Sequence, residues 1–321
     1  MARSEEVRFR AGSETLAGTL TLPETGDARL PWALLIPSWL PRTRDGDWDR
    51  ERHPEWFAPA PGSPPAPLAR VAEALAGRGV ASLRYDPRGC GESGGDWASS
   101  DLFTRIDDAR DAIGAMRSRP ELDLRRTAVV GHGEGTVIAL SVAISDPAIG
   151  AVGLVGAWAR SFRDVLRRGA AERSRTGTDR DQPIVVALDR AAEELIERAD
   201  RREPRMSLVL DGGSAQLNLA GWEQAFHTPP LALATMLHRP VVLLHGGADA
   251  WSAPDEGRLL EATLREAGND PAFQLTDAGG HDLAEVTDGQ LDAFAAGMRE
   301  RMQPRELPPV LVAIEQMSDG G

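Results

Sequence analysis

Short apolar runs alternate with amphipathic helical patterns along most of this chain of 321 residues, and this alternation restricts the fold more than any other feature. The helical pattern is clearest over residues 102–116, where apolar side chains recur at helical spacing. Residues 7–22 read as two short antiparallel strands around Gly12. The later runs that suit buried strands cover residues 32–36, 80–85, 127–130, 151–155, 241–245 and 272–276. Strands that alternate with helices in this way predict an α/β fold with a doubly wound, mostly parallel sheet.

One long segment interrupts the alternation between the apolar runs 151–155 and 241–245. It is far longer than an ordinary connection, and helical patterns occur at 184–199 and 231–237. We interpret it as an inserted helical cap, because open α/β sheets bind ligands beyond the carboxyl edge that such a cap would cover. The predicted organisation is a core of residues 1–156 and 240–305, a cap of residues 157–239, and a C-terminal tail of residues 306–321 that lacks strong periodicity and frays at its end.

A tight turn is predicted where the run 127–130 gives way to a helical pattern. Residues 131–135 read Gly-His-Gly-Glu-Gly, which is the frame of a G-x-S-x-G nucleophile elbow with Gly133 where the serine belongs. The flanking glycines allow the close approach of strand and helix that this turn needs. Glycine also adopts left-handed backbone angles without a steric cost, so Gly133 suits the turn. It has no side chain that could attack a carbonyl group.

Four other segments accompany the elbow in a fixed order along the chain. They are residues 35–46, the turn Asp-Pro-Arg-Gly-Cys-Gly-Glu-Ser at 86–93, Asp249 just after an apolar run, and His281 after a Gly-Gly pair. Together the five segments resemble the α/β-hydrolase superfamily, and within it the cap-bearing serine esterases and the S9- and S33-like peptidases. The resemblance implies an α/β-hydrolase fold with an oxyanion loop at 35–46. It also implies His281 as general base, Asp249 as the acid that orients it, and position 133 as the site of the nucleophile, in the chain order that this fold uses.

The sequence departs from this pattern at Gly133 and in the oxyanion loop, where Ser38, Trp39 and Leu40 replace small residues. Oxyanion holes use backbone N–H groups, so by position the donors are the N–H of Glu134 and one from Ser38 or Trp39. The side chain of Trp39 is expected to crowd the pocket. Ser38 is the nearest candidate for a displaced nucleophile, whereas Cys90 reads as a small buried hydrophobe.

Eight tryptophans are unusual beside a single tyrosine, and several fall in predicted loops or in the cap. Trp158 and Trp251 are expected near the carboxyl edge of the sheet, where a pocket should lie, and Trp39 and Trp222 are further candidates for substrate binding. One hypothesis is that they line a site for an apolar or aromatic ligand. The other is that they only seal the cap against the sheet.

Composition excludes several classes of function. The net charge of −13 argues against nucleic acid or an anionic membrane as partner. No spacing of His, Cys, Asp or Glu suggests a metal, and no G-x-G-x-x-G follows a strand, so we expect neither a metal nor another cofactor. A single cysteine excludes an internal disulfide, and the sequence has neither an apolar leader nor a membrane span. These features predict a cytoplasmic protein; its oligomeric state stays open.

Three hypotheses about function remain open at this point. The first is an enzyme that acts on an acyl- or ester-bearing hydrophobic small molecule, with Gly133 either native or an engineered replacement of serine. The second is a lyase or cyclase of specialised-metabolite (antibiotic) biosynthesis that uses His281 as a base without covalent catalysis. The third is an inactive paralogue that binds a small molecule. Retention of both His281 and Asp249 favours the two enzymatic hypotheses.

Overall fold

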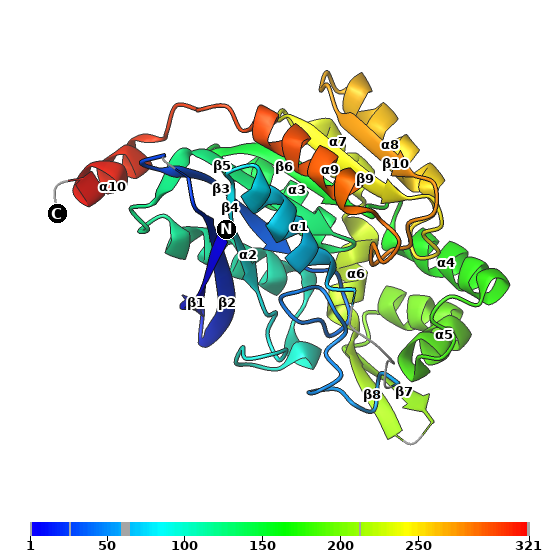
Figure 1. Cartoon of the computed structure of the whole chain (residues 1–321). Helices are drawn as coiled ribbons and strands as arrows, with labels where there is room; N and C mark the ends of the chain where they lie inside the picture. Colours follow the sequence, from blue (N-terminus) through cyan, green and yellow to red (C-terminus); the bar gives the residue numbers. More distant parts are fainter. Residues whose placement is uncertain (1, 26, 59–64, 212, 320–321) are drawn as a thin grey trace.

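The computed structural model describes residues 2–25, 27–58, 65–211 and 213–319. Eight strands form one sheet in the order β1-β2-β4-β3-β5-β6-β9-β10 (Figure 1). The strands β1 and β2 pair antiparallel, as do β2 and β4, and the remaining neighbours pair parallel. The strand bounds are β1 Ala2–Ala11, β2 Glu14–Pro23, β3 Leu30–Ile36, β4 Ala81–Tyr85, β5 Leu122–His132, β6 Ile149–Val155, β9 Val241–Gly246 and β10 Ala272–Thr276.

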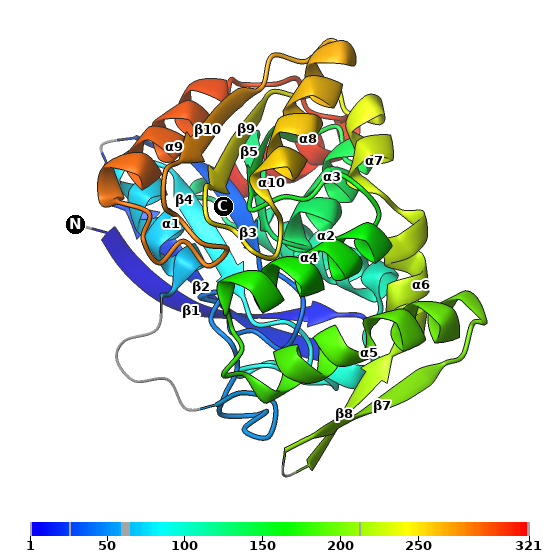
Figure 2. The ribbon, with the colours of Figure 1, turned by 90° about the vertical axis from the view of Figure 1, so that its right-hand side faces the viewer.

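Helices cover both faces of this sheet, which explains why its central strands are apolar throughout. All seven residues of β3 are buried, and its side chains alternate between two cores. Helices α1 and α9 pack together over one face, while α2, α3, α7 and α8 lie on the other (Figures 1 and 2). The bounds of the helices outside the predicted cap are α1 Pro67–Gly77, the short 3-10 helix η1 Trp97–Ser99, α2 Leu102–Met116, α3 Gly135–Ser145, α8 Pro254–Glu266 and α9 Asp288–Arg301.

The prediction of an α/β fold with a mostly parallel, doubly wound sheet is therefore confirmed. The antiparallel pair expected around Gly12 is also present, with Gly12 at a φ of 57° between β1 and β2. Helix α2 follows the predicted range, and its N-terminus is capped by the Asp101 side chain, which accepts the Thr104 N–H at 2.7 Å.

The segment between β6 and β9 contains more than the helices expected of a cap. Its elements are α4 Phe162–Thr176, α5 Pro183–Asp200, β7 Arg205–Leu210, β8 Gly213–Asn218, α6 Leu219–His227 and α7 Pro230–Met236. Helices α5 and α7 match the two predicted ranges. An antiparallel hairpin of β7 and β8 corrects the purely helical prediction, and its signal was the alternation of buried Met206, Leu208 and Leu210. The division at 157–239 stays a prediction, and α7 packs on α3 and α8 beside the sheet.

The C-terminal tail is more regular than the sequence suggested. Residues Pro309–Asp319 form α10, and the buried Leu307 and Leu311 pack with Leu124 and Ala148 in a small core of their own. Glu315 of α10 also pairs with Arg125 at 2.8 Å. The expected fraying falls on residues 320–321, which lie outside the described residues. Among the helices of the described ranges, none is long and apolar enough to cross a membrane.

The elbow between β5 and α3 depends on glycines at close contacts. A Cβ at Gly131 would lie 2.1 Å from the carbonyl oxygen of Gly135, and a Cβ at Gly135 would lie 2.3 Å from that of Ile36. Both contacts are with backbone, which cannot move aside as the end of a side chain can. The close approach of β3, β5 and α3 therefore requires glycine at both positions.

We expect Gly135→Ala to lower the free energy of unfolding by about 3 kcal/mol or more, because the added methyl group overlaps the Ile36 carbonyl. Urea denaturation monitored by circular dichroism measures this loss. The matched control is Gly114→Ala in α2, where a Cβ meets nothing within 4 Å. Because alanine favours helices, the control should be neutral or slightly stabilising. Equal effects of the two substitutions would contradict the packing argument.

Candidate active site

His281 and Asp249 come from loops that follow neighbouring parallel strands. Asp249 follows β9 and His281 follows β10, so both loops emerge at the carboxyl edge of the sheet. The His281 Nδ1–H donates to Asp249 Oδ2 at 2.9 Å. The other carboxylate oxygen, Oδ1, accepts the backbone N–H groups of Trp251 and Ser252, both at 2.8 Å. These bonds fix the carboxylate, and the carboxylate fixes the imidazole.

Both groups of this pair are buried, and each shifts the pKa of the other. Burial disfavours the charged forms, but the charge of Asp249 and its hydrogen bond overcome this effect and raise the pKa of His281 above its ordinary value. For Asp249, burial acts to raise the pKa, and the charge and hydrogen bond of His281 outweigh it and lower the pKa. The arrangement favours an ionised carboxylate that stabilises a protonated imidazole, as a catalytic His–Asp pair must.

His132, the second residue of the elbow, lies against the back of this pair. Its ring centroid is 4.7 Å from that of His281, and its Nε2–H donates to the His281 carbonyl oxygen at 2.9 Å. Burial, together with the neighbouring His281, lowers the pKa of His132 to about 3, so this ring stays neutral. Asp282 forms an ion pair with Arg42 at 2.9 Å close to the same rings. This partly buried ion pair was not predicted from the sequence.

His245, which ends β9, lies behind Asp249. Its Nε2–H donates to the Ser252 carbonyl oxygen at 2.7 Å, and the same nitrogen is 3.8 Å from Asp249 Oδ2. His245 therefore helps to hold the loop that carries Asp249.

Gly133 faces both His281 and Ser38. Its φ is 54°, in the left-handed region, and a Cβ at this position would lie 2.9 Å from His281 Nε2. The free nitrogen of the imidazole is thus directed at the place from which a side chain at the elbow would project. The same point lies 2.1 Å from Ser38 Oγ, and Ser38 is buried. The hydroxyl of Ser38 therefore occupies the space that is empty at Gly133.

The backbone of Glu134 borders the space beside Gly133, and its side chain pairs with a residue of α2. Its N–H is directed at Ser38 Oγ, at a long distance of 3.4 Å. Its carboxylate is buried and pairs with Arg105 of α2 at 3.0 Å. Burial raises the pKa of Glu134, and Arg105 opposes this shift. Arg105 was not predicted, since in sequence it is one more charge on an amphipathic helix.

The four predicted tryptophans belong to one cluster of aromatic rings. Trp39 makes edge-to-face contacts with Trp222 at 5.1 Å and with Trp251 at 5.8 Å between ring centroids. Phe162 of α4 completes the group, 5.0 Å from Trp39 and 5.4 Å from Trp158. The ring of Trp251 also lies 6.3 Å from that of His281. An aromatic wall of Trp39, Trp158, Phe162, Trp222 and Trp251 therefore stands beside the His–Asp pair.

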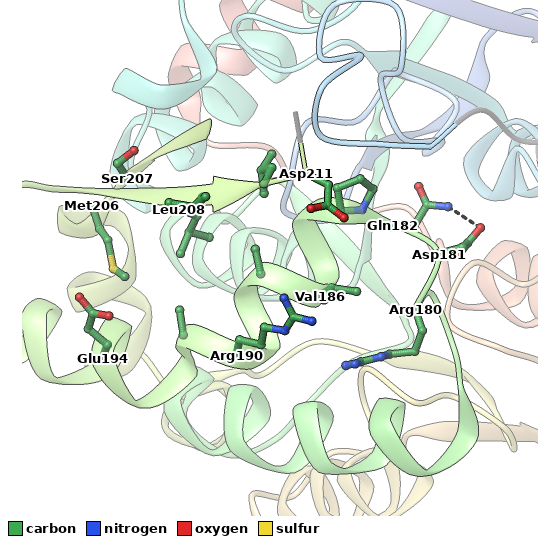
Figure 3. A pocket seen from close by; sticks show the side chains of 15 residues that line it. Arg180, Asp181, Gln182, Val186, Arg190, Glu194, Met206, Ser207, Leu208 and Asp211 are labelled. Atoms are coloured by element: carbon green, nitrogen blue, oxygen red, sulfur yellow. Dashed lines mark hydrogen bonds between the residues drawn. The ribbon is translucent and has the colours of Figure 1, made fainter. Parts of the chain in front are cut away.

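Little empty volume remains within this wall. A cavity of about 20 Å³ lies between Trp39, Arg105, Glu134 and Trp222, and one of about 10 Å³ lies beside Ser38. A much larger hollow of about 560 Å³ lies elsewhere, between α5 and β7, and Figure 3 shows the polar side chains at its rim. None of the predicted site residues lines it, so its size does not make it the candidate active site.

Asp179, in the loop between α4 and α5, also reaches the site and was not predicted. Its Oδ2 accepts the indole N–H of Trp251 at 2.7 Å, and its φ is 55°. Burial raises the pKa of Asp179, and the bond from Trp251 opposes this. The buried Arg173 guanidinium lies 3.8 Å from the Trp251 ring centroid and pairs with Asp189 at 2.5 Å. The predicted cap therefore contacts the loop of Asp249 through both an acid and a cation.

Two groups of side chains in the described ranges have ligand atoms close enough together to hold a metal ion. One consists of Asp49, His53 and Cys90, and the other of His132, His281 and Asp282. In the first, Asp49 Oδ2 already accepts the Gly91 N–H at 2.7 Å, and burial raises the pKa of the Cys90 thiol. In the second, one ring nitrogen of each histidine makes a hydrogen bond described above: His132 Nε2 and His281 Nδ1. The expectation that the protein holds no metal stays a prediction.

Comparison with known proteins bears on the fold that carries these residues. A family model described as serine aminopeptidase, S33, matches residues 67–171, a minority of the chain that includes the elbow. No curated protein sequence matches. Similar structures include Est1E from Butyrivibrio proteoclasticus with ferulic acid bound (14% identity, TM-score 0.65, covering 92% of this chain and 99% of that one). The esterase domain of a Rhodothermus marinus protein (17%, TM-score 0.59, 94% and 100%) and the α/β-hydrolase GrgF from Penicillium sp. sh18 (16%, TM-score 0.61, 94% and 99%) are also similar.

At these identities the structural likeness establishes the fold. The chain therefore has the α/β-hydrolase fold, and over residues 67–171 it is similar to the S33 serine aminopeptidases. The serine that the name of the matching family model implies is glycine at position 133.

We expect the imidazole of His281 to titrate above its ordinary value of about 6.5, because Asp249 stabilises the charged ring. In Asp249→Asn, burial acts without that charge, so the pKa of His281 should fall below the ordinary value. Proton NMR of the histidine Hε1 signals, assigned with His281→Gln, measures both values. His132 serves as internal reference, since it should stay neutral down to a pH of about 3. An unchanged His281 titration in Asp249→Asn would contradict the coupling.

Proposed function

We propose that this protein is an enzyme that acts on an acyl- or ester-bearing hydrophobic small molecule, with His281 as general base and Asp249 as its partner. One observation carries the proposal: His281 Nδ1 is held by Asp249 while His281 Nε2 lies 2.9 Å from the Cβ position of residue 133. A base held in one tautomer and directed at the elbow is the arrangement that acyl transfer in this fold requires.

In the proposed mechanism, His281 first accepts a proton and then donates it to the leaving group. The neutral His281 removes a proton from the attacking hydroxyl group, and the ionised Asp249 stabilises the imidazolium that results. The imidazolium then protonates the leaving group. The backbone N–H of Glu134, with that of Trp39 or Ser38, is proposed to bind the oxyanion at the start of α3, where the helix dipole also favours negative charge.

The aromatic wall supports a hydrophobic or aromatic substrate. Trp39, Trp222 and Trp251 present apolar rings next to the base, and apolar walls with a few polar groups are typical of small-molecule sites. The structure of Est1E holds ferulic acid, an aromatic acid, in a protein of the same fold. The net charge of −13 further supports a small molecule, not a nucleic acid, as partner. The single, buried Cys90 supports a cytoplasmic location.

The alternative is a lyase or cyclase of specialised metabolism in which His281 removes a proton from the substrate itself. Gly133 favours it, because an elbow without a hydroxyl cannot form an acyl-enzyme intermediate at position 133. Such an enzyme would convert its substrate without an acyl-enzyme intermediate. An inactive binding protein is supported least, because such a protein has no need of a buried ion pair of histidine and aspartate.

We expect the purified protein to hydrolyse p-nitrophenyl esters and His281→Ala to lower kcat/KM about 10³-fold or more, because the general base is lost. Stopped assays at several pH values measure this, and activity should fall as the pH drops through the raised pKa of His281. The matched control, His238→Ala, removes an exposed histidine and should leave the activity unchanged. Absence of ester turnover, with conversion of a biosynthetic intermediate that depends on His281, would favour the lyase. Binding of apolar ligands alone would favour the inactive paralogue.

Replacement of Trp39 tests the proposed position of the substrate. Trp39→Ala should shift the preference among p-nitrophenyl esters toward longer acyl chains by about tenfold, since the indole fills the space beside Ser38 and Glu134. The ratio of kcat/KM for hexanoate and acetate esters measures the shift. Trp32→Phe, deep in the opposite end of the core, is the control and should leave the ratio unchanged. A constant ratio in Trp39→Ala would place the acyl chain elsewhere.

A further inference from the structure

We propose that the hydroxyl of Ser38 is the nucleophile of this enzyme, delivered from the end of β3 into the space that a serine at the elbow would fill. The inference rests on the proposed function and identifies the group that attacks the acyl carbon. It explains why the His–Asp pair is complete while the elbow carries glycine.

The register of the sheet brings Ser38 to the elbow. Strands β3 and β5 are parallel, and Ile36 pairs with Gly131 at their carboxyl ends. Two residues beyond this pair the chain reaches Ser38 on one strand and Gly133 on the other. The two positions therefore lie side by side. A Cβ at Gly133 would lie 2.8 Å from Ser38 Cβ and 2.1 Å from Ser38 Oγ.

The place of the Ser38 hydroxyl depends on glycine at position 133. With any side chain at 133, its Cβ would overlap the hydroxyl of Ser38, so the hydroxyl has this place only because residue 133 is glycine. An ordinary elbow serine would also have to displace Ser38 before it could reach the same space. This complementarity indicates that the two residues belong to one arrangement.

The groups that activate an elbow serine surround Ser38 instead. A Cβ at Gly133 would lie 2.9 Å from His281 Nε2 and 2.1 Å from Ser38 Oγ, so the base and the hydroxyl border the same space. The Glu134 N–H, at the N-terminal end of the eleven-residue α3, is directed at Ser38 Oγ at 3.4 Å. The positive end of the helix dipole favours negative charge on an oxygen at this place.

Backbone strain in the loop supports a functional position for Ser38. Leu40, two residues further on, has a φ of 66° although it is neither glycine nor asparagine, and its side chain is fully buried. A bulky residue in the left-handed region costs free energy and persists only where its surroundings impose it. The strained turn lies within the loop that holds the Ser38 hydroxyl beside the base.

The chemistry balances without any added reactant except water. Ser38 Oγ attacks the acyl carbon as its proton passes to His281 Nε2, and a tetrahedral intermediate forms. The bond from the acyl carbon to the ester oxygen then breaks, and the leaving alcohol takes the proton from His281. Water attacks the acyl-Ser38 ester and gives a proton to His281, which returns it to Ser38 Oγ as the carboxylic acid departs.

Active-site labelling of the unmodified protein tests the inference directly. A fluorophosphonate probe should form one covalent adduct, and peptide mapping by mass spectrometry should locate it on Ser38. Ser38→Ala should lose the adduct and lower kcat about 10³-fold or more, with unchanged thermal unfolding. Ser145→Ala, an exposed serine of α3, is the matched control and should keep both labelling and turnover. An adduct on any other residue would overturn the inference.

Moving the hydroxyl back to the elbow gives an independent test. The double variant Gly133→Ser with Ser38→Ala makes room for a serine at 133, so labelling should return there, whereas Gly133→Ser alone should lower turnover through crowding. Ester hydrolysis that needs His281 but survives Ser38→Ala would overturn the role of Ser38 and leave the proposed function intact. A protein that neither labels nor hydrolyses esters, in any variant, would overturn both.

Discussion

The parallel pairing of β3, β5, β6 and β9 is the constraint on which the rest of the site depends. Because these strands run in one direction, the chain leaves each of them at the same edge of the sheet, and the loops that follow carry Ser38, Gly133 and Asp249. The pairing of β10 with β9 adds the loop of His281. Strands β3, β6 and β9 are buried over their full length, so a slip of one residue in their pairing would turn apolar side chains to the wrong core. The sheet therefore sets the positions from which the site residues project. The loops only need to be short and held by hydrogen bonds.

The charged side chains that are buried or partly buried at the carboxyl edge of the sheet form pairs. Asp249 has His281 and two backbone N–H groups, Glu134 has Arg105, and Asp282 has Arg42. Buried pairs contribute little net stability, because the cost of desolvation offsets most of their attraction. Three of these groups act on His281 itself: Asp249 and Asp282 act to raise its pKa, and Arg42 acts to lower it. The neutral His132 adds to this, since a second positive ring in contact with His281 would oppose its protonation.

The sequence predicted those features of the molecule that local patterns of residues encode. Alternating apolar runs predicted the sheet, and the elbow frame predicted the turn after β5, because only glycines tolerate its backbone contacts. It could not predict Arg105 or Asp179, since a charge on a helix or in a loop reads the same whether it meets solvent or a buried partner. The contact between Ser38 and Gly133 depends on strand register across 95 positions of sequence, which neither local motif contains. The hairpin of β7 and β8 was missed although its alternation was visible, because the long insertion was interpreted as helical throughout.

The aromatic wall also constrains how a substrate could reach the base. Sites for small molecules usually enclose about 300 Å³ or more, whereas the cavities beside Trp39 and Ser38 hold about 20 and 10 Å³. A substrate of the proposed class therefore needs side chains to move, and the contacts that resist this are identifiable. Trp39 comes from the core and packs against Phe162 and Trp222 of the insertion. Trp251 is bonded to Asp179 and stacked under Arg173 of the same insertion. Displacement of the insertion would break the contacts of Trp39 and Trp251 with it in one step. Rotation of Trp39 alone would need space that its closely packed neighbours already occupy.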